Sequence, residues 1–523
     1  MKQVISFNKN FAWFLKFLWY KFDRLCYSVH VKKLDKKEQQ ARREIVMRKT
    51  KIVCTIGPAS ESEEMLRKLM LAGMNTARIN FSHGGFKEQE EKINRIKKVR
   101  EELKLPVALL LDTKGPEIRT GKFQEGQIFL NEGDVIILTT EDILGDEKEF
   151  SVSYQELPEE VVPGDTLLFD DGLIEVEVLS IEGKKVSCKV ISGGKLSNRK
   201  GVNIPGKKLK LPTMTEKDKE DIVNGVKAGF DYIAASFIRS AKDVNEIRAL
   251  LKENGGEAIK IISKIENQEG VDNFDEILEA SDGIMVARGD LSVEIPMARV
   301  PAIQKEFIRK TYLQGKIVIT ATQMLESMIH NPRPTRAEVS DISNAMYDAT
   351  SAVMLSGESA TGKYPVECVE LMDAIAQETE GSINYWKRFQ TRDYDLAHKG
   401  YRFNVYHGIS VSAMNLDAKA IIAYTESGDT PGILSAFCPP CPIYAITRNE
   451  KLVRQLNLEF NVYPRHITGD MSIDDMIQSV IEKLESEGKV EKGDTIIIAG
   501  GAEMLPDLKG TKTNKVIGGI IQL

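Results

Sequence analysis

The sequence predicts an α/β protein built around an eight-stranded (β/α)8 barrel of the TIM type, with an inserted small all-β domain and a C-terminal α/β domain. Three observations lead to this fold class. Eight short apolar runs alternate with longer amphipathic stretches, which is the pattern of parallel strands connected by helices. The alternation breaks once, after the third run, and a shorter series of the same kind follows the eighth. The length of 523 residues accommodates several domains.

The runs are short and rich in Val, Ile and Ala, and the first three cover residues 51–56, 74–81 and 107–112. We expect each of them to be a barrel strand. From 117 to 212 the apolar residues alternate with a period of two between Gly, Pro and Asp turns, and helical periodicity is weak. The segment 117–212 is therefore predicted to be a small all-β domain inserted into the first domain.

The strand-helix alternation resumes after this insertion. The remaining five runs cover 231–236, 260–266, 283–288, 316–322 and 352–356. With the first three they complete a barrel over 47–116 and 213–385, close to the roughly 250 residues that such a barrel needs. Runs at 420–424, 443–446 and 495–499 predict a smaller C-terminal α/β domain over 386–523.

Residues 1–46 do not match the pattern that follows. Their apolar, aromatic stretch at 11–20 is flanked by basic residues, and it is shorter than the about 20 apolar residues that span a bilayer. No small-residue cleavage site of the secretory kind follows it. Two interpretations stay open: a helix that lies on a membrane surface, or an upstream start codon with the working chain beginning at Met47. Under neither interpretation do we expect residues 1–46 to insert stably into a membrane.

The overall charge excludes one class of partner. The formal net charge is -6 and the isoelectric point about 5.8, which argues against a general nucleic-acid-binding protein. A small anionic substrate is still compatible, because local basic residues bind such a substrate within an acidic protein.

The six cysteines are dispersed, which favours a reducing compartment and predicts a cytoplasmic protein. Cys438 and Cys441 have the spacing of a redox or zinc pair. No second pair completes a metal site, so we interpret this spacing as chance.

Polar residues end six of the eight predicted barrel strands, where barrel enzymes place their active sites. Side chains alternate between the two faces of a strand, so Lys264 and Glu266 are expected to point the same way. By the same rule, Arg78, Asn80 and Ser82 share one side of the second strand.

Glu266 and Asp290 end neighbouring strands, and two carboxylates with water and substrate oxygens suit Mg²⁺. A metal ion, Lys264 and Arg78 together suit a transferring phosphoryl group, whose catalysis depends on positioning and charge neutralisation. The alternative for a single Lys-Glu pair is an ion pair that closes the barrel rim.

A second oxygen-rich group consists of Asn80, Ser82, Asp112 and Thr113. One carboxylate with neutral oxygens suits a monovalent cation, and a hydrogen-bond network between strand ends is the alternative. Spacing alone does not choose between them. His83 by itself is more typical of a structural or surface histidine, and no complete P-loop or dinucleotide fingerprint is present.

Several segments, in this order, resemble the pyruvate kinase family over the chain from Met47 to the C-terminus. They are KIVCTIGPAS at 51–60, ARINFSHG at 77–84, LDTKGPEIRTG at 111–121, KGVNIPG at 200–206, ISKIENQEGVDNFDEIL at 262–278, GIMVARGDL at 283–291, ITATQMLESM at 319–328, NPRPTRAEVSD at 331–341 and VMLSGESATGKYP at 353–365. The resemblance implies phosphoryl transfer from phosphoenolpyruvate to ADP, with pyruvate and ATP as products, and a homotetramer.

The resemblance also implies a role for each matching residue. The catalytic residues are expected to be Lys264, Arg78 and Thr322, of which Thr322 belongs to the route that protonates the enolate. Phosphoenolpyruvate is expected to contact Arg78, Lys264, Gly289, Asp290 and Thr322. Glu266 and Asp290 would bind Mg²⁺ or Mn²⁺.

For the other ligands, the resemblance implies a K⁺ site at Asn80, Ser82, Asp112 and Thr113. ADP or ATP would contact Arg119, Lys200, Asn80 and His83, with the inserted domain closing as a lid that excludes water. The resemblance also implies that glutamate at position 117 is typical of family members that need a monovalent cation, whereas members that do not need potassium are expected to carry lysine there.

Two departures from the family pattern stand out. Ser292 occupies a position where the family usually has glycine, two residues after Asp290, so we expect altered geometry at the metal or the substrate. The segment 425–428 resembles the start of an effector phosphate loop, but 429–439 lacks the usual basic residues, which puts sugar-phosphate activation in doubt. Two alternatives remain: an aldolase-type barrel enzyme that handles a pyruvate enolate on Mg²⁺, and a non-catalytic relative.

Overall fold

The structure is a computed structural model, and it describes residues 47–82, 84–501 and 516–523. Everything described below belongs to one compact unit, Arg48–Leu523. The segment 1–46 and the predicted nucleotide contact His83 lie outside the described residues. No helix in the described part of the chain is both long enough and apolar enough to cross a bilayer.

Eight parallel strands close into a barrel in the order β1-β18-β17-β16-β15-β14-β3-β2. They are β1 (Lys51–Thr55), β2 (Thr76–Asn80), β3 (Ala108–Asp112), β14 (Tyr232–Ala235), β15 (Lys260–Ile265), β16 (Gly283–Ala287), β17 (Ile317–Ala321) and β18 (Ala352–Leu355). Almost every residue in them is buried, as expected for parallel strands covered on both faces. The predicted fold class is confirmed.

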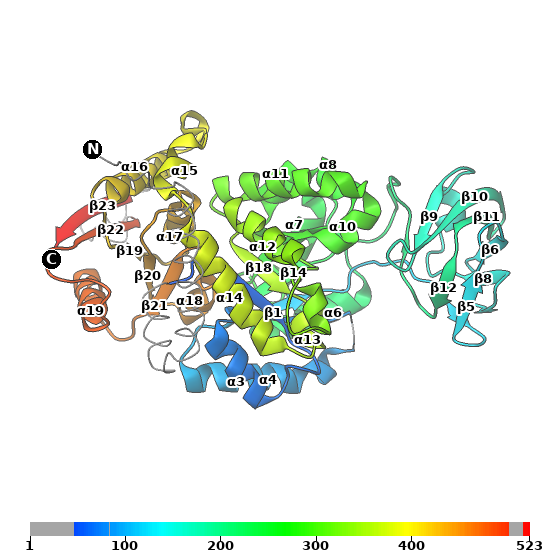
Figure 1. Ribbon diagram of the computed structural model, residues 1–523, viewed down its shortest axis with the longest axis horizontal. Coiled ribbons are helices and arrows are strands. Elements are labelled where there is room, and N and C mark those ends of the chain that lie inside the picture. Colours follow the sequence, from blue (N-terminus) through cyan, green and yellow to red (C-terminus); the bar gives the residue numbers. More distant parts are fainter. Residues whose placement is uncertain (1–46, 83, 502–515) are drawn as a thin grey trace, which may run out of the picture. The chain divides into compact units, whose positions relative to one another are not determined.

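Helices surround the barrel, drawn in blue, green and yellow-green in Figure 1. They are α3 (Glu63–Ala72), α4 (Phe86–Leu103), α6 (Glu216–Lys227), α7 (Ala241–Glu253), α8 (Gln268–Asp272), α9 (Phe274–Ala280), α10 (Arg288–Glu294), α11 (Val300–Leu313), α12 (Arg336–Tyr347), α13 (Gly357–Ala360) and α14 (Pro365–Gly381). Complete capping boxes at Thr215, Ser240 and Thr335 determine where α6, α7 and α12 begin.

The insertion between β3 and β14 is an all-β unit with its own apolar core (Figure 1, cyan). Its sheets have the strand orders β13-β9-β10-β11-β6-β8, β12-β5 and β4-β7. The elements are β4 (Lys122–Phe123), β5 (Gln127–Leu130), β6 (Val135–Thr139), β7 (Leu144–Gly145), β8 (Glu149–Ser151), α5 (Leu157–Glu160), β9 (Thr166–Phe169), β10 (Ile174–Glu182), β11 (Lys185–Ser192), β12 (Gly194–Ser197) and β13 (Val202–Asn203). Buried and exposed residues alternate along β5, which is the pattern that predicted these strands.

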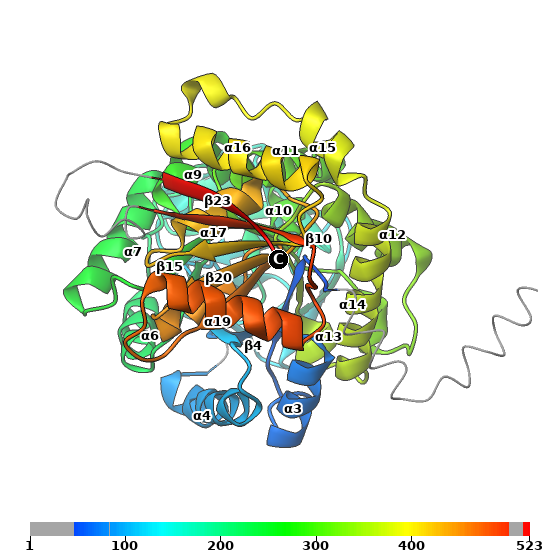
Figure 2. The ribbon, with the colours of Figure 1, turned by 90° about the vertical axis from the view of Figure 1, so that its left-hand side faces the viewer.

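The C-terminal domain has one five-stranded sheet in the order β21-β20-β19-β22-β23. Its elements are α15 (Tyr385–Thr391), α16 (Tyr401–Asn415), β19 (Ala420–Tyr424), α17 (Asp429–Ala436), β20 (Ile443–Thr447), α18 (Glu450–Leu456), β21 (Val462–His466), α19 (Ile473–Ser486), β22 (Thr495–Gly501) and β23 (Val516–Gln522). Figures 1 and 2 show α16 and α19 on opposite sides of this sheet.

Sequence patterning predicted the three inner strands of this sheet and missed both edge strands. The edge strand β21 carries Pro464 and two basic residues, so it does not appear as an apolar run. The other edge, β23, contains two adjacent glycines and pairs antiparallel to β22.

Cys438 and Cys441 are both buried free thiols. Cys438 packs with the core around the barrel, whereas Cys441 packs with the core of the C-terminal domain. Within the described residues no group of three or more His, Cys, Asp or Glu side chains is arranged to hold a metal ion.

Candidate active site

Lys264 points into the barrel near the carboxyl end of β15. Ile262, two residues earlier, belongs to the apolar cluster inside the barrel, whereas Ile261 and Ile265 pack with the cluster formed against the helices. The alternation of strand side chains therefore directs Lys264 and Glu266 inward. The two groups meet, with 2.9 Å between Nζ of Lys264 and Oε1 of Glu266.

The ammonium of Lys264 has three oxygen acceptors, one for each of its protons. Besides Glu266, Nζ donates to Oγ of Ser236 at 2.8 Å and to Oδ1 of Asp112 at 3.1 Å. Burial by itself lowers the pKa of Lys264, but the charges of Asp112, Glu266 and Asp290 outweigh burial and raise that pKa above its usual value. Lys264 is thus a permanently charged group with a defined direction.

Arg78 extends this charged group to the neighbouring strands. Its Nε donates to Oδ2 of Asp112 at 2.6 Å, and its Nη1 donates to Oγ1 of Thr55 at 2.8 Å. Burial opposes ionisation of Asp112, but the charges of Arg78 and Lys264 outweigh burial and lower the pKa of Asp112. One carboxylate therefore holds both cations at the barrel mouth.

Glu266 and Asp290 are the candidate metal ligands. Oε2 of Glu266 accepts the backbone N–H of Phe237 at 2.6 Å. Burial, together with the charge of Asp290, raises the pKa of Glu266, while Lys264 acts in the opposite direction. Asp290 is exposed on α10. Two carboxylates close enough to influence each other fit a hard cation that takes its other ligands from water and substrate.

The four residues predicted to bind a monovalent cation lie at the ends of adjacent strands. The register of β2 and β3 pairs Asn80 with Asp112. Oδ1 of Asn80 accepts the N–H of Ser82 at 3.0 Å, and Oγ1 of Thr113 accepts the N–H of Ser236 at 3.0 Å. These bonds form part of the hydrogen-bond network that was the alternative interpretation, while leaving each oxygen a second lone pair for a cation.

Thr322 follows β17 in a backbone conformation that β-branched residues seldom adopt. Its φ is 68°, and that of Gln323 is 51°. Oγ1 of Thr322 accepts the N–H of Gly289 at 2.8 Å and donates to the carbonyl of Ala321 at 2.6 Å. Arg288 braces the turn, because its Nη2 donates to the carbonyl of Thr322 at 2.6 Å. The strained turn therefore holds Thr322 against the start of α10.

Ser292 is accommodated within its own helix. Its Oγ donates to the carbonyl of Gly289 at 2.8 Å, three residues earlier in α10. The hydroxyl thus lies against the backbone of a residue that is predicted to contact substrate.

The basic residues of the insertion that were predicted to bind nucleotide are paired with acids. Nε and Nη2 of Arg119 donate to Oε2 of Glu117 at 2.9 and 2.6 Å. Nζ of Lys200 lies 2.8 Å from Oδ1 of Asp170. Sequence analysis gave no indication of the second pair, because Asp170 and Lys200 are 30 residues apart and meet only when the insertion folds.

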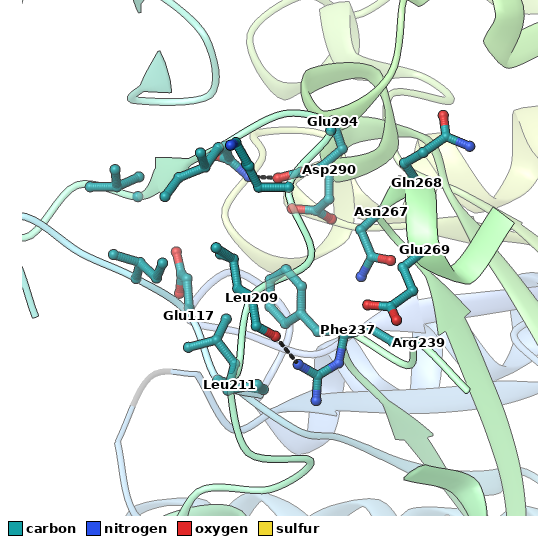
Figure 3. Close-up of a pocket in the computed structure, with 18 of the residues that line it drawn as sticks. Glu117, Leu209, Leu211, Phe237, Arg239, Asn267, Gln268, Glu269, Asp290 and Glu294 are labelled. Carbon is teal, nitrogen blue, oxygen red and sulfur yellow. Dashed lines mark hydrogen bonds between the residues drawn. The ribbon is translucent and has the colours of Figure 1, made fainter. Parts of the chain in front are cut away.

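A pocket of about 90 Å³ lies between residues of the insertion and of the barrel (Figure 3). Asp290, Glu294, Asn267 and Glu269 line one side of it, and Glu117 lines the other. Nη1 of Arg239 donates to the carbonyl of Leu209 at 3.3 Å across this boundary. Asp290, the exposed candidate metal ligand, lines this pocket, so a molecule bound in the pocket lies next to its carboxylate.

Sequence analysis missed Ser236 and Phe237, which follow β14. Oγ of Ser236 accepts from Lys264 and donates to the carbonyl of Thr113 at 2.7 Å. Phe237, with φ 57°, presents its N–H to Glu266. The rule that located the other site residues, a polar residue at a strand end, applies to Ser236 as well.

We expect Ser236→Ala to lower kcat about tenfold or more while leaving KM nearly unchanged. The hydrogen bond to a charged group contributes about 1.5–3 kcal/mol, and its loss lets the ammonium move away from its working position. Steady-state kinetics would measure this, with Ser236→Thr as the variant that keeps the hydroxyl. An unchanged kcat in Ser236→Ala would show that Asp112 and Glu266 are sufficient to hold Lys264.

Comparison with known proteins identifies the family. The family model described as "Pyruvate kinase, barrel domain" matches residues 47–369, and that described as "Pyruvate kinase, alpha/beta domain" matches residues 404–517. The chain belongs to the pyruvate kinase family. It is therefore an enzyme, and the predicted resemblance is confirmed.

Individual pyruvate kinases agree with this assignment. One from Sporosarcina psychrophila is 51% identical over 457 residues, which are 87% of this chain and 78% of the relative. One from Clostridium acetobutylicum is 50% identical over 456 residues, which are 87% of this chain and 96% of the relative. A crystal structure of a pyruvate kinase from Cryptosporidium parvum has a TM-score of 0.85 at 37% identity and covers 92% of this chain and 97% of that one.

Membership of the pyruvate kinase family decides against the aldolase-type alternative. The inserted domain and the Lys264 site belong to one continuous match with pyruvate kinase sequences.

Proposed function

We propose that this enzyme transfers the phosphoryl group of phosphoenolpyruvate to ADP, giving pyruvate and ATP. The observation that carries the proposal is the position of the Lys264 ammonium, fixed by three acceptors at the mouth of the barrel beside Arg78. Phosphoryl transfer needs little covalent chemistry from the protein, and its catalysis consists mainly of positioning and charge stabilisation. Two fixed cations at one barrel mouth meet that need.

In this proposal Arg78 and Lys264 bind the phosphoryl oxygens, and Lys264 stabilises the charge that develops during transfer. Glu266 and Asp290 would hold Mg²⁺ or Mn²⁺, which supplies further charge neutralisation when bound. The substrate would also contact Gly289, Asp290 and Thr322. Gly289 and Thr322 are already held together by the hydrogen bond from the N–H of Gly289 to Oγ1 of Thr322. Thr322 would take part in protonating the enolate.

The potassium site and the nucleotide site belong to the same proposal. Asn80, Ser82, Asp112 and Thr113 would hold K⁺. Arg119 and Lys200 would exchange Glu117 and Asp170 for the phosphates of ADP, because phosphate oxygens are strong acceptors for both side chains. Asn80 and His83 would contact the nucleotide as well, and four copies of the chain would assemble into a homotetramer in the cytoplasm.

The test is a coupled assay of pyruvate formation from phosphoenolpyruvate and ADP. We expect activity that is lost on chelating divalent metal and lowered on replacing K⁺ by a bulky organic cation. Chains starting at Met1 and at Met47 should be compared, since the proposal places all chemistry after Met47. A folded protein without activity under every condition would overturn the proposed reaction. Activity that does not respond to K⁺ would overturn the potassium site alone.

A further inference from the structure

A group of basic and phenolic side chains lies where α15 meets the loop after α17, away from the active site. We name it the Arg392 cluster. It consists of Tyr312, Tyr385, Arg388, Arg392, Tyr394 and Cys438. Tyr385 and Arg388 lie three residues apart in α15 and so share one side of it, and Arg392 follows the helix directly in an extended conformation.

Three polar atoms in this cluster are completely buried and form no hydrogen bond of standard geometry among the described residues, although the Tyr394 hydroxyl interacts with Arg392. They are the hydroxyls of Tyr385 and Tyr394 and the Nη1 of Arg388. The two tyrosines are only 8% and 5% exposed. Buried polar groups in folded proteins almost always have a partner, so three without one at a single place require an explanation.

The two arginines also lack a counter-charge. Nη1 of Arg392 donates to Sγ of Cys438 at 3.3 Å, and its guanidinium lies 4.2 Å above the ring of Tyr312. Nη2 of Arg388 donates to the carbonyl of Tyr347 at 2.8 Å. Neither guanidinium forms an ion pair within residues 47–82, 84–501 and 516–523.

Glu380 is the carboxylate whose charge acts on Tyr385. Its two oxygens already accept the backbone N–H groups of Lys49 and Thr50, at 2.8 and 2.7 Å. Glu380 therefore holds the residues that lead into β1 rather than the cluster.

The missing partner has to accept hydrogen bonds and carry negative charge. Burial raises the pKa of Tyr385 and of Tyr394, so both hydroxyls keep their protons and can donate them. Both guanidinium groups are partly buried, and neither has a counter-ion among the described residues. A water molecule satisfies hydrogen bonds but does not neutralise charge.

We propose that the Arg392 cluster binds a small inorganic anion, a halide or a compact oxyanion such as phosphate. Tyr312 and Cys438 also line a pocket of about 10 Å³ beside the cluster, which has room for roughly one water-sized sphere. Tyr312 belongs to barrel helix α11, and Cys438 belongs to the loop that leads into β20 of the C-terminal domain. An anion held here links these parts of the chain.

Thermal unfolding at constant ionic strength tests the proposal, with a bulky sulfonate salt replaced stepwise by bromide in one arm and by phosphate in another. We expect the Tm to rise and to saturate with at least one of these anions, and the arms distinguish halide from oxyanion. Arg392→Gln should raise the half-saturating concentration about tenfold or more, because a hydrogen bond to a charged group is lost. Tyr394→Phe, which removes one hydroxyl, should weaken binding in the same direction.

Two control variants define the site. Lys264→Met should keep the saturable rise, which excludes anion binding at the active site as its source. Arg67→Gln, on exposed α3, should keep it as well. Anomalous diffraction from bromide-soaked crystals should place a peak within hydrogen-bond distance of Arg392. The proposal is wrong if the rise is absent, if it persists unchanged in Arg392→Gln, or if a carboxylate of a second copy occupies the cluster.

Discussion

Lys264→Met is expected to lower kcat for pyruvate formation by about 10³–10⁵-fold, the range in which a cation that stabilises a phosphoryl-transfer transition state contributes. Methionine has a similar length but no charge, so it removes the positive group without emptying the barrel mouth. It also leaves Asp112 and Glu266 buried without the ammonium that lies between them. Steady-state kinetics with saturating phosphoenolpyruvate and ADP would measure the loss.

Lys260→Met is the matched control. Lys260 begins the same strand, four residues before Lys264. Its Nζ forms a weak ion pair with Oε1 of Glu459, at 3.9 Å. The same substitution there changes the charge of β15 without reaching the barrel mouth, so kcat should stay near that of the unmodified enzyme. Equal kcat values in the two variants would show that the charge of Lys264 does not act on the transferring group.

The barrel was predictable because its strands are buried on both faces and therefore appear as continuous apolar runs. The same property explains what was missed. The edge strand β21 carries Pro464 and two basic residues, and β23 contains two glycines, so neither has the apolar pattern of an inner strand. Edge strands face less of the core, and their sequences are less constrained by burial.

Part of the site was predictable from the rule that polar residues end barrel strands. The rule placed Lys264 and Glu266 on one face, and the structure brings their charged groups to 2.9 Å. The rule did not indicate that Asp112 bonds to both Arg78 and Lys264. These three residues lie on three different strands, β3, β2 and β15, and meet only in the closed barrel.

The two strand ends that sequence analysis left aside are those of β1 and β14. Thr55 ends β1 and accepts a hydrogen bond from Arg78, and Ser236 follows β14 and accepts one from Lys264. A neutral hydroxyl at a strand end is common, so its type alone carries little information. Its importance comes from the cation opposite it, which only the closed barrel defines.

Asp231→Ala is expected to destabilise the fold more than any substitution of a surface carboxylate. Asp231 is completely buried before β14, where Oδ1 accepts from Nε of Arg454 at 3.0 Å and Oδ2 accepts the N–H of Leu109 at 2.9 Å. Nη1 of Arg100 lies 3.9 Å from Oδ2. Removing the carboxylate leaves Arg100 and Arg454, both largely buried, without their counter-charge, which lowers the free energy of unfolding by about 3–5 kcal/mol.

Chemical denaturation would measure this as a lower unfolding midpoint, and Asp417→Asn is the control. Asp417 is 92% exposed and pairs with Lys419 at 3.2 Å, and asparagine tolerates its positive φ of 48°, so the loss of this charge should change stability by no more than about 0.5 kcal/mol. Equal midpoints for the two variants would show that Arg100 and Arg454 find other partners once Asp231 is gone.

Asp231→Ala also tests whether stability and catalysis depend on opposite ends of β14. Asp231 precedes β14 and Ser236 follows it, so one end of this strand contacts Arg454 of the C-terminal domain and the other end holds the ammonium of Lys264. β14 keeps its pairing with β3 and β15 in the variant, because those bonds are made by the backbone. We therefore expect Asp231→Ala to keep nearly the full kcat below its unfolding transition. A large loss of kcat in the folded variant would mean instead that the contact with Arg454 positions the catalytic end of β14.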